Sequence, residues 1–135
     1  MKKKILVTIE CAEDGTYACY SEEPIGTYAL VCGDGKTVEE AKKDFINAVN
    51  ECAELCHEDE TYRNLCFNYK YDIRSFFNYF GFINVSEIAK IAGINPSLMR
   101  QYTSGIKKPG ERTYKKMSEC FDKIKQEFES ASFRD

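Results

Sequence analysis

The chain lacks the long apolar segment that a membrane-spanning helix needs. None of its apolar runs approaches the ~20 residues required to cross a bilayer. The N-terminal sequence MKKKILVTIECAEDG has a basic tip, but the apolar stretch after it is short, alternates with polar residues and contains Glu10. The core of a secretory signal peptide would not tolerate that charge. We therefore expect a cytoplasmic protein with no membrane partner.

Histidine is almost absent, and cysteine pairs at the spacing of a zinc site are missing. The chain has seven cysteines, an odd number that, without an export signal, argues against a disulfide-bonded secreted scaffold. The single histidine, His57, follows Cys56, and Cys52 lies four residues before Cys56 on a predicted helix. No second pair accompanies them at a finger-like spacing. We interpret these cysteines as packing residues and predict neither a metal site nor a cofactor.

Sequence signatures of the common enzyme classes are also missing. The chain has no phosphate-binding loop and no recognisable Ser/His/Asp or Cys/His arrangement. The carboxylates that could hold Mg²⁺ in a nuclease-like domain are Glu10, Asp14, Asp34 and Glu40. They fall on predicted hairpin tips and a helix cap, whereas phosphoryl chemistry needs carboxylates that converge. We predict a binding protein without catalytic residues, with a metal-dependent nuclease as the alternative.

The length of 135 residues suits one compact domain or two small ones. Charge is distributed unevenly along these residues. Residues 1–85 carry 9 basic and 15 acidic residues, whereas residues 86–135 carry 10 basic and 7 acidic residues. Between Asn95 and Lys116, six basic residues are opposed only by Glu111. An acidic first half and a locally basic second half indicate two different partners.

The first half of the chain has the apolar period of strands, with one helix among them. Alternation predicts strands over residues 4–11, 16–21, 28–32 and 65–71, with turns at residues 13–15 and 33–35. The sequence Thr37-Val38-Glu39-Glu40 is a capping box, and an apolar stripe continues the predicted helix to about His57. The order βββαβ predicts an antiparallel sheet with one helix packed on it, in a domain spanning residues 1–71.

From Asp72 onward every pattern is helical, which predicts an all-α domain over residues 72–135 and an α+β chain as a whole. A first helix is expected at residues 73–80, and Pro109 is expected to open a last one. The inward side chains expected on that last helix are Tyr114, Met117, Phe121, Ile124 and Phe128. Between these helices lies the most informative segment of the sequence.

Residues 85–104, VSEIAKIAGINPSLMRQYTS, fit the helix-turn-helix template. Ala89 is the small residue where the second helix crosses the first, and Gly93 lies at the turn, where a positive φ is cheapest without a Cβ. Met99 and Tyr102 share one inward helical face. The remaining apolar contacts are expected from Ile88, Ile91 and Ile94. Such a unit presents its second helix to the DNA major groove; a helical hairpin that merely resembles the motif is the alternative.

The second helix of this motif carries the candidate DNA contacts. Asn95 is a good N-cap, and Gly105 is expected to end the helix. The candidate base-contacting residues are Asn95, Ser97, Arg100 and Gln101. Gln101 could pair with adenine, and Arg100 with guanine or with a phosphate. The candidate phosphate-contacting residues in the segment that follows are Lys107, Lys108 and Arg112. One unit covers one half-site, so we expect a homodimer or a higher oligomer on operator DNA.

Both halves of the chain resemble the HicB-like antitoxins. The first half contains KKKILVTIECAEDGTYACYSEE and then GDGKTVEEAKKDFINAV, where the residues that match the family signature are Gly33, Gly35, Thr37, Glu39, Glu40 and Ala41. The second half, with FNYKYDIRSFFNYF and AGINPSLMRQYTSGIKKPGERTYKK, resembles the helix-turn-helix tail of that family. The resemblance implies that the first domain is a degenerate ribonuclease-H-like unit without nuclease activity.

The resemblance also implies a function in a toxin–antitoxin system. In this family the first domain sequesters HicA, a small basic mRNA endoribonuclease, and the second domain represses the shared operon. A HicA-like toxin and operator DNA are therefore the expected partners. The alternative is a solitary helix-turn-helix transcriptional regulator whose N-terminal domain serves dimerisation or ligand sensing.

Overall fold

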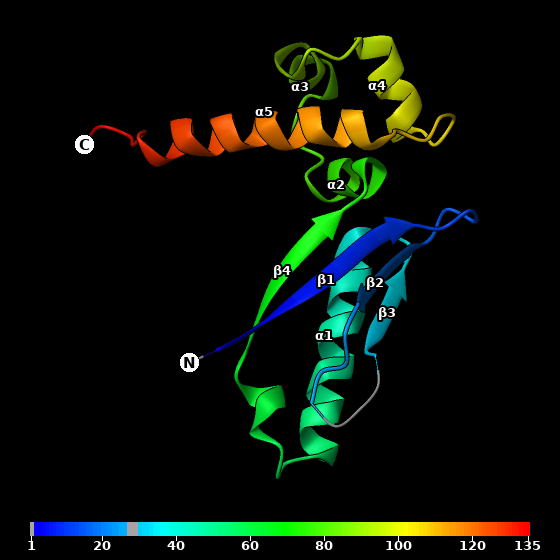
Figure 1. Cartoon of the computed structure of the whole chain (residues 1–135), viewed down its shortest axis with the longest axis vertical. Helices are drawn as coiled ribbons and strands as arrows, with labels where there is room; N and C mark the ends of the chain where they lie inside the picture. The colour runs from blue at the N-terminus through cyan, green and yellow to red at the C-terminus, as the bar shows by residue number, and fades with distance from the viewer. Residues whose placement is uncertain (1, 27–29) are drawn as a thin grey trace. The chain divides into compact units, whose positions relative to one another are not determined.

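The computed structural model describes residues 2–26 and 30–135, which form an α+β fold. Figure 1 shows a sheet with helices in the first part of the chain and helices alone in the second. The chain divides into two compact units, Met1–Tyr79 and Phe80–Asp135. Within the described residues, no helix is both long and apolar enough to span a membrane.

The first unit is built on a four-stranded sheet in the order β3-β2-β1-β4. Strand β2 (Tyr17–Ser21) pairs antiparallel with β1 (Lys3–Cys11) on one side and with β3 (Cys32–Gly35) on the other. Strand β4 (Leu65–Tyr71) pairs with β1 in parallel. The sheet is therefore mixed, and the prediction of an antiparallel sheet is wrong for β4.

The direction of β4 follows from the connection that precedes it. Two antiparallel steps make β3 run in the same direction as β1. The helical crossover after β3 returns the chain to the start of the sheet, so the next strand runs in that direction too. Because β4 lies beside β1, the pair is parallel.

Helix α1 (Val38–Leu55) lies across one face of the sheet (Figure 1). It begins at Thr37, whose Oγ1 accepts a hydrogen bond from the Glu40 backbone N–H at 3.1 Å, while Glu40 Oε2 accepts one from the Lys36 N–H at 2.8 Å. This is the predicted capping box, with its second bond shifted by one residue. The side chains that α1 buries against the sheet are Val38, Ala41, Phe45 and Val49.

Glycines in β3 allow α1 to lie close to the sheet. A Cβ on Gly33 would collide with the Phe45 backbone nitrogen, and one on Gly35 would lie 2.5 Å from Glu40 Cβ. The close approach of the helix explains why glycine occupies these two positions of the strand. Residues 33–35 pair with β2 as part of β3, so the predicted turn there is wrong. The third strand was expected at residues 28–32, of which residues 28 and 29 lie outside the described part of the chain.

A short 3₁₀ helix, η1 (Glu60–Arg63), precedes β4, and helix α2 (Ile73–Tyr79) follows it. The Asp72 carboxylate accepts hydrogen bonds from the backbone N–H of Ser75 at 2.7 Å and of Cys11 in β1 at 2.9 Å. Asn78 Oδ1 accepts one from the Val38 N–H at 3.0 Å. These bonds tie α2 to the sheet unit, so the unit extends to Tyr79, eight residues beyond the expected domain end at residue 71.

The second unit consists of α3 (Val85–Ala92), α4 (Pro96–Thr103) and α5 (Glu111–Glu129). The buried side chains of these elements and of their connections are Ile88, Ala89, Ile94, Met99, Met117 and Cys120. Two expected core residues are instead exposed: Ile91 at 61% and Phe128 at 74%. Ile91 lies about 200° around α3 from the buried Ala89. Phe128 lies two turns beyond Cys120, the last buried residue of α5.

Candidate nucleic-acid interface

The turn between α3 and α4 is fixed by backbone hydrogen bonds. Gly93 has φ +74°, as expected for the turn glycine. Its N–H donates to the Lys90 carbonyl at 3.2 Å, and the Ile94 N–H donates to the Ala89 carbonyl at 2.8 Å. This is the Schellman pattern, in which an apolar contact accompanies the two bonds. Ala89 and Ile94 are both buried, so the direction in which α4 leaves α3 is set.

The N-terminus of α4 is capped by Asn95. Its Oδ1 accepts hydrogen bonds from the backbone N–H groups of Ser97 at 2.8 Å and of Leu98 at 3.4 Å, and Pro96 occupies the first helical turn. Asn95 was also a predicted base contact. Because its carbonyl oxygen already serves the helix, the Nδ2 amide group is the part of this side chain that could reach a base.

The outer face of α4 brings three of the predicted base-contacting residues together. Met99 is fully buried on the inner face, and Tyr102 is half-buried beside it. Ser97, Arg100 and Gln101 are three and four residues apart, so they are neighbours on the same side of the helix. Ser97 and Arg100 are exposed and Gln101 is half-exposed. This face, composed of Ser97, Arg100 and Gln101, is called the α4 face below.

The Arg100 side chain on the α4 face is hydrogen-bonded to two serine hydroxyls. Its Nη1 donates a hydrogen bond to Ser86 Oγ on α3 at 3.0 Å, and its Nη2 donates to Ser97 Oγ at 3.2 Å. Ser86 lies 14 residues before Arg100 and is not among the residues predicted to contact DNA. Its contact depends on how α3 and α4 cross, and residue spacing along one helix carries no signal for it.

The predicted phosphate-contacting residues lie on the exposed surface just beyond α4. Gly105 has φ +82° and follows the end of the helix, as expected. The backbone N–H groups of Ile106 and Lys107 both donate to the Gln101 carbonyl, at 3.0 and 3.2 Å, which folds the loop back on the helix end. Lys107 and Lys108 are exposed in this loop, and Arg112 is exposed in the first turn of α5.

The four carboxylates considered for a nuclease site do not all lie together. Glu10 in β1 and Asp34 in β3 alternate with residues packed toward α1, so they lie on the opposite, open face of the sheet. Glu40 is on the α1 side and serves the capping box. Asp14 Oδ1 accepts hydrogen bonds from the Thr16 hydroxyl at 2.6 Å and from the Thr16 N–H at 3.0 Å, and these bonds hold the pKa of Asp14 below its usual range.

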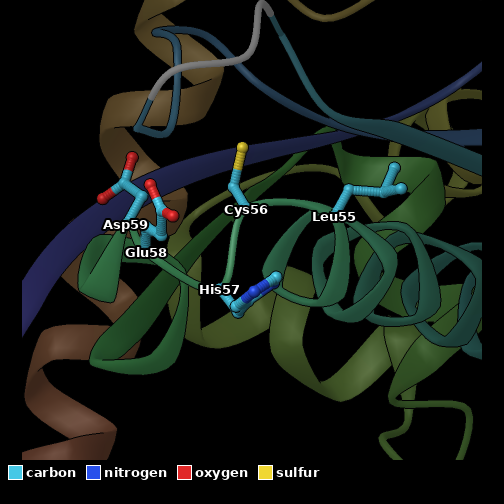
Figure 2. Close-up of a pocket in the computed structure, with 5 residues that line it drawn as sticks. All are labelled: Leu55, Cys56, His57, Glu58 and Asp59. Atoms are coloured by element: carbon cyan, nitrogen blue, oxygen red, sulfur yellow. The ribbon is translucent and has the colours of Figure 1, made fainter.

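The end of α1 carries the cysteines and the histidine considered for a metal site. An open hollow of about 590 Å³ is lined there by Leu55, Cys56, His57, Glu58 and Asp59. Figure 2 shows the Cys56 thiol and the His57 imidazole pointing in different directions. His57 Nδ1 lies 3.3 Å from the Glu54 carbonyl oxygen. Within residues 2–26 and 30–135, no three His, Cys, Asp or Glu side chains form a group that could hold a metal.

Two candidate binding surfaces of opposite charge result from this geometry, one on each unit. The second unit presents the α4 face and the exposed basic residues after it. The first unit presents acidic residues at the end of α1, where positions 51–60 contain five carboxylates and no lysine or arginine. Comparison of the chain with protein-family models, with curated proteins and with solved structures found no match.

Proposed function

We propose that the second unit is a helix-turn-helix domain that binds operator DNA, and that the chain is a transcriptional repressor. The observation that carries this proposal is the division of α4 into two faces. Met99 is buried, whereas Ser97 and Arg100 are exposed on the other side. A recognition helix needs this division, because one face must pack on the domain while the other enters the major groove.

The charge of the surrounding surface supports DNA as the ligand. Lys107, Lys108 and Arg112 are exposed in the segment that follows α4. Arg112 stands in the first turn of α5, where the helix dipole disfavours a cation. Helix stability therefore does not favour Arg112 at this position, and its exposed charge suits contact with a phosphate.

The chemistry of the α4 face assigns a role to each side chain. Gln101 can pair with adenine through its amide, and Arg100 can pair with guanine through two N–H donors. Ser97 and the Asn95 amide group can each form single hydrogen bonds to base edges. A good bidentate pair discriminates against the wrong base by about 1–3 kcal/mol. One such helix reads only one half-site, so the proposed active form is a homodimer on a near-palindrome.

The direct test is binding of the full-length protein to the DNA upstream of its own gene. We expect specific binding that weakens steeply as salt rises. Arg100→Ala and Gln101→Ala should each lower specific affinity by about tenfold or more, whereas Lys125→Ala, at an exposed position in the second half of α5, should not. Lys107→Ala should weaken binding to all sequences and reduce the salt slope by about one.

Two results would contradict this assignment. Absence of any protected region upstream of the gene in a footprinting experiment would oppose the repressor function. Normal specific binding by both Arg100→Ala and Gln101→Ala, with the fold intact by circular dichroism, would show that another surface reads the DNA.

We further propose that the first unit binds a small basic protein, as the resemblance to HicB-like antitoxins implies. The support is electrostatic. Positions 51–60 hold five acidic residues, and the last turn of α1 has no basic residue to balance them. Carboxylates near a helix C-terminus oppose the helix dipole, so this arrangement costs stability that a basic partner would recover. Leu55 is 71% exposed beside them and could supply an apolar contact.

This second function is tested with the product of a short basic reading frame beside the gene. We expect a stable complex that also protects cells from the toxicity of that product. Glu51→Lys combined with Glu54→Lys should weaken the complex, whereas Lys43→Glu on the same helix should not weaken it. If no such product binds, the solitary regulator is the better description. Mg²⁺-dependent nuclease activity of the purified chain would contradict the non-catalytic assignment.

A further inference from the structure

We propose that Ser86, on α3, determines the base preference of Arg100 on α4 by fixing the direction of its guanidinium group. The inference rests on the proposed DNA-binding function and goes beyond it, because Ser86 lies outside the recognition helix. It also assigns guanine, rather than a phosphate, as the group that Arg100 contacts.

Two hydrogen bonds hold the guanidinium group of Arg100, one at each of its two terminal nitrogens. Nη1 donates to Ser86 Oγ at 3.0 Å, and Nη2 donates to Ser97 Oγ at 3.2 Å. The two hydroxyls come from different helices, so rotation of the arginine side chain would break at least one of the bonds. A free arginine side chain loses rotamer entropy when it binds a ligand. A side chain held before binding loses less of that entropy when it meets its ligand.

Hydrogen bonds at both ends of α3 fix the position of Ser86. Asn84 Oδ1 accepts a hydrogen bond from the Glu87 N–H at 3.1 Å, which caps the first turn of α3 around Ser86. At the other end of α3, the turn at Gly93 sets the direction of α4. Ala89 is fully buried between these two points. The distance between Ser86 and Arg100 is therefore a property of the folded unit and needs no DNA.

The partners of Arg100 leave its charge and its donors available. Ser86 and Ser97 are neutral, so neither cancels the positive charge. The acidic neighbour of Ser86, Glu87, pairs instead with Lys90 at 3.3 Å. A guanidinium has five N–H donors, and when each hydroxyl takes one, three remain. Those three still include one on each Nη nitrogen, which is enough for a bidentate contact.

A fixed guanidinium suits a guanine better than a phosphate. Guanine presents O6 and N7 at one edge, and recognition requires two N–H donors aligned with both acceptors. Phosphate contacts position the protein on DNA without reading sequence, and a mobile cation can make them. Two hydrogen bonds that orient Arg100 are explained by base recognition, and a phosphate contact would not need them.

The test is selection of preferred sites from a random DNA pool by the full-length protein and its Ser86 variants. Ser86→Ala should reduce the guanine preference at one position of each half-site and lower affinity for the wild-type site by about three- to tenfold. Ser86→Thr, which keeps the hydroxyl, should retain the preference. Binding to non-specific DNA and the melting temperature should be unchanged. Ser118→Ala, an exposed serine of α5, is the matched control.

A double substitution separates positioning by Ser86 from a direct contact with DNA. In an Arg100→Ala background, Ser86→Ala should have no further effect on affinity or base preference. Additive losses, or a wild-type base preference in Ser86→Ala, would overturn the inference while the DNA-binding function stands. If the wild-type protein selects no preferred site at all, the proposed function fails as well, so the two failures are distinguishable.

Discussion

At the residue scale, the left-handed backbone conformation of Gly93 ends α3 and begins the turn into α4. A glycine after an amphipathic stretch predicts a left-handed helix end, and φ is +74° in the structure. The same reasoning identified Asn95 as an N-cap, and its Oδ1 does accept the expected backbone hydrogen bonds. Both predictions succeed because the interactions lie within a few residues of the chain.

Substitution of Gly93 should reveal the cost of its backbone conformation alone. A Cβ at this position would meet nothing within 4 Å, so steric collision does not contribute. Gly93→Ala should destabilise the second unit by about 1–2 kcal/mol, and Gly93→Asn by less, because asparagine tolerates the left-handed region. Urea unfolding followed by circular dichroism measures both. An alanine variant as stable as the wild type would contradict this account of the turn.

Cys19 gives the first unit a dependence on alkaline pH. Burial in the core raises the pKa of its thiol to about 12, against an ordinary value near 9, and the nearby Lys42 offsets only part of that rise. The folded pKa is the higher one, so this contribution to stability is complete below pH 9 and is lost as pH rises from 9 to 12.

The pH dependence is measured by urea unfolding at pH 8 and pH 10. The Cys19 thiol should account for about 1 kcal/mol of the stability that the wild type loses between these values. Cys19→Ala should lose correspondingly less between the two, although it is less stable at pH 8. Cys32→Ala, at an exposed cysteine, should behave as the wild type does. The account fails if Cys19→Ala loses as much stability as the wild type.

At the scale of elements, the spacing of apolar residues and the capping residues predict where most helices and strands lie. They do not predict which elements lie side by side. The residues of β1, β4 and α1 were predicted almost to their ends, because alternation and the capping box are local signals. Alternation indicates which side chains share a face of a strand, and it carries no information about which strand lies alongside. The parallel pairing of β4 with β1 was therefore missed.

The placement of α2 shows the same limit. Lys42 of α1 has its Nζ 4.0 Å from the Tyr69 ring centroid and 3.9 Å from the Tyr79 ring centroid, and it donates a hydrogen bond to the Tyr71 hydroxyl at 3.0 Å. This cation–π cluster joins α1, β4 and α2. Its members are up to 37 residues apart in sequence, so the helical pattern after Asp72 could not show that α2 belongs with the sheet.

The glycines of β3 provide a test of how α1 packs on the sheet. Gly33→Ala would place a Cβ against the backbone of Asp44 and Phe45, so the helix or the strand must shift. We expect a loss of about 1–3 kcal/mol or more, the range of overpacked cores. Asp34→Ala, on the open face of the same strand, should change stability little. Equal effects of the two substitutions in urea unfolding would contradict the close approach of α1 to β3.

At the scale of the whole molecule, the chain combines two units with surfaces of opposite charge. This division is predictable from the sequence, because the charge along the chain is visible directly. Helical spacing also predicts that Ser97, Arg100 and Gln101 share one face. The contact of Ser86 with Arg100 could not be predicted, because it depends on the crossing of two helices. The proposed functions combine a DNA-binding second unit with a protein-binding first unit.

The measurement that tests this account most directly is a map of backbone amide NMR shifts as operator DNA is added to the full-length, ¹⁵N-labelled protein. We expect the largest changes at Ser86, along α4 and in the loop through Lys108, at Arg112, and little change in the strands and α1. Changes concentrated on the sheet or α1, with α4 unaffected, would contradict the assignment of DNA binding to the α4 face.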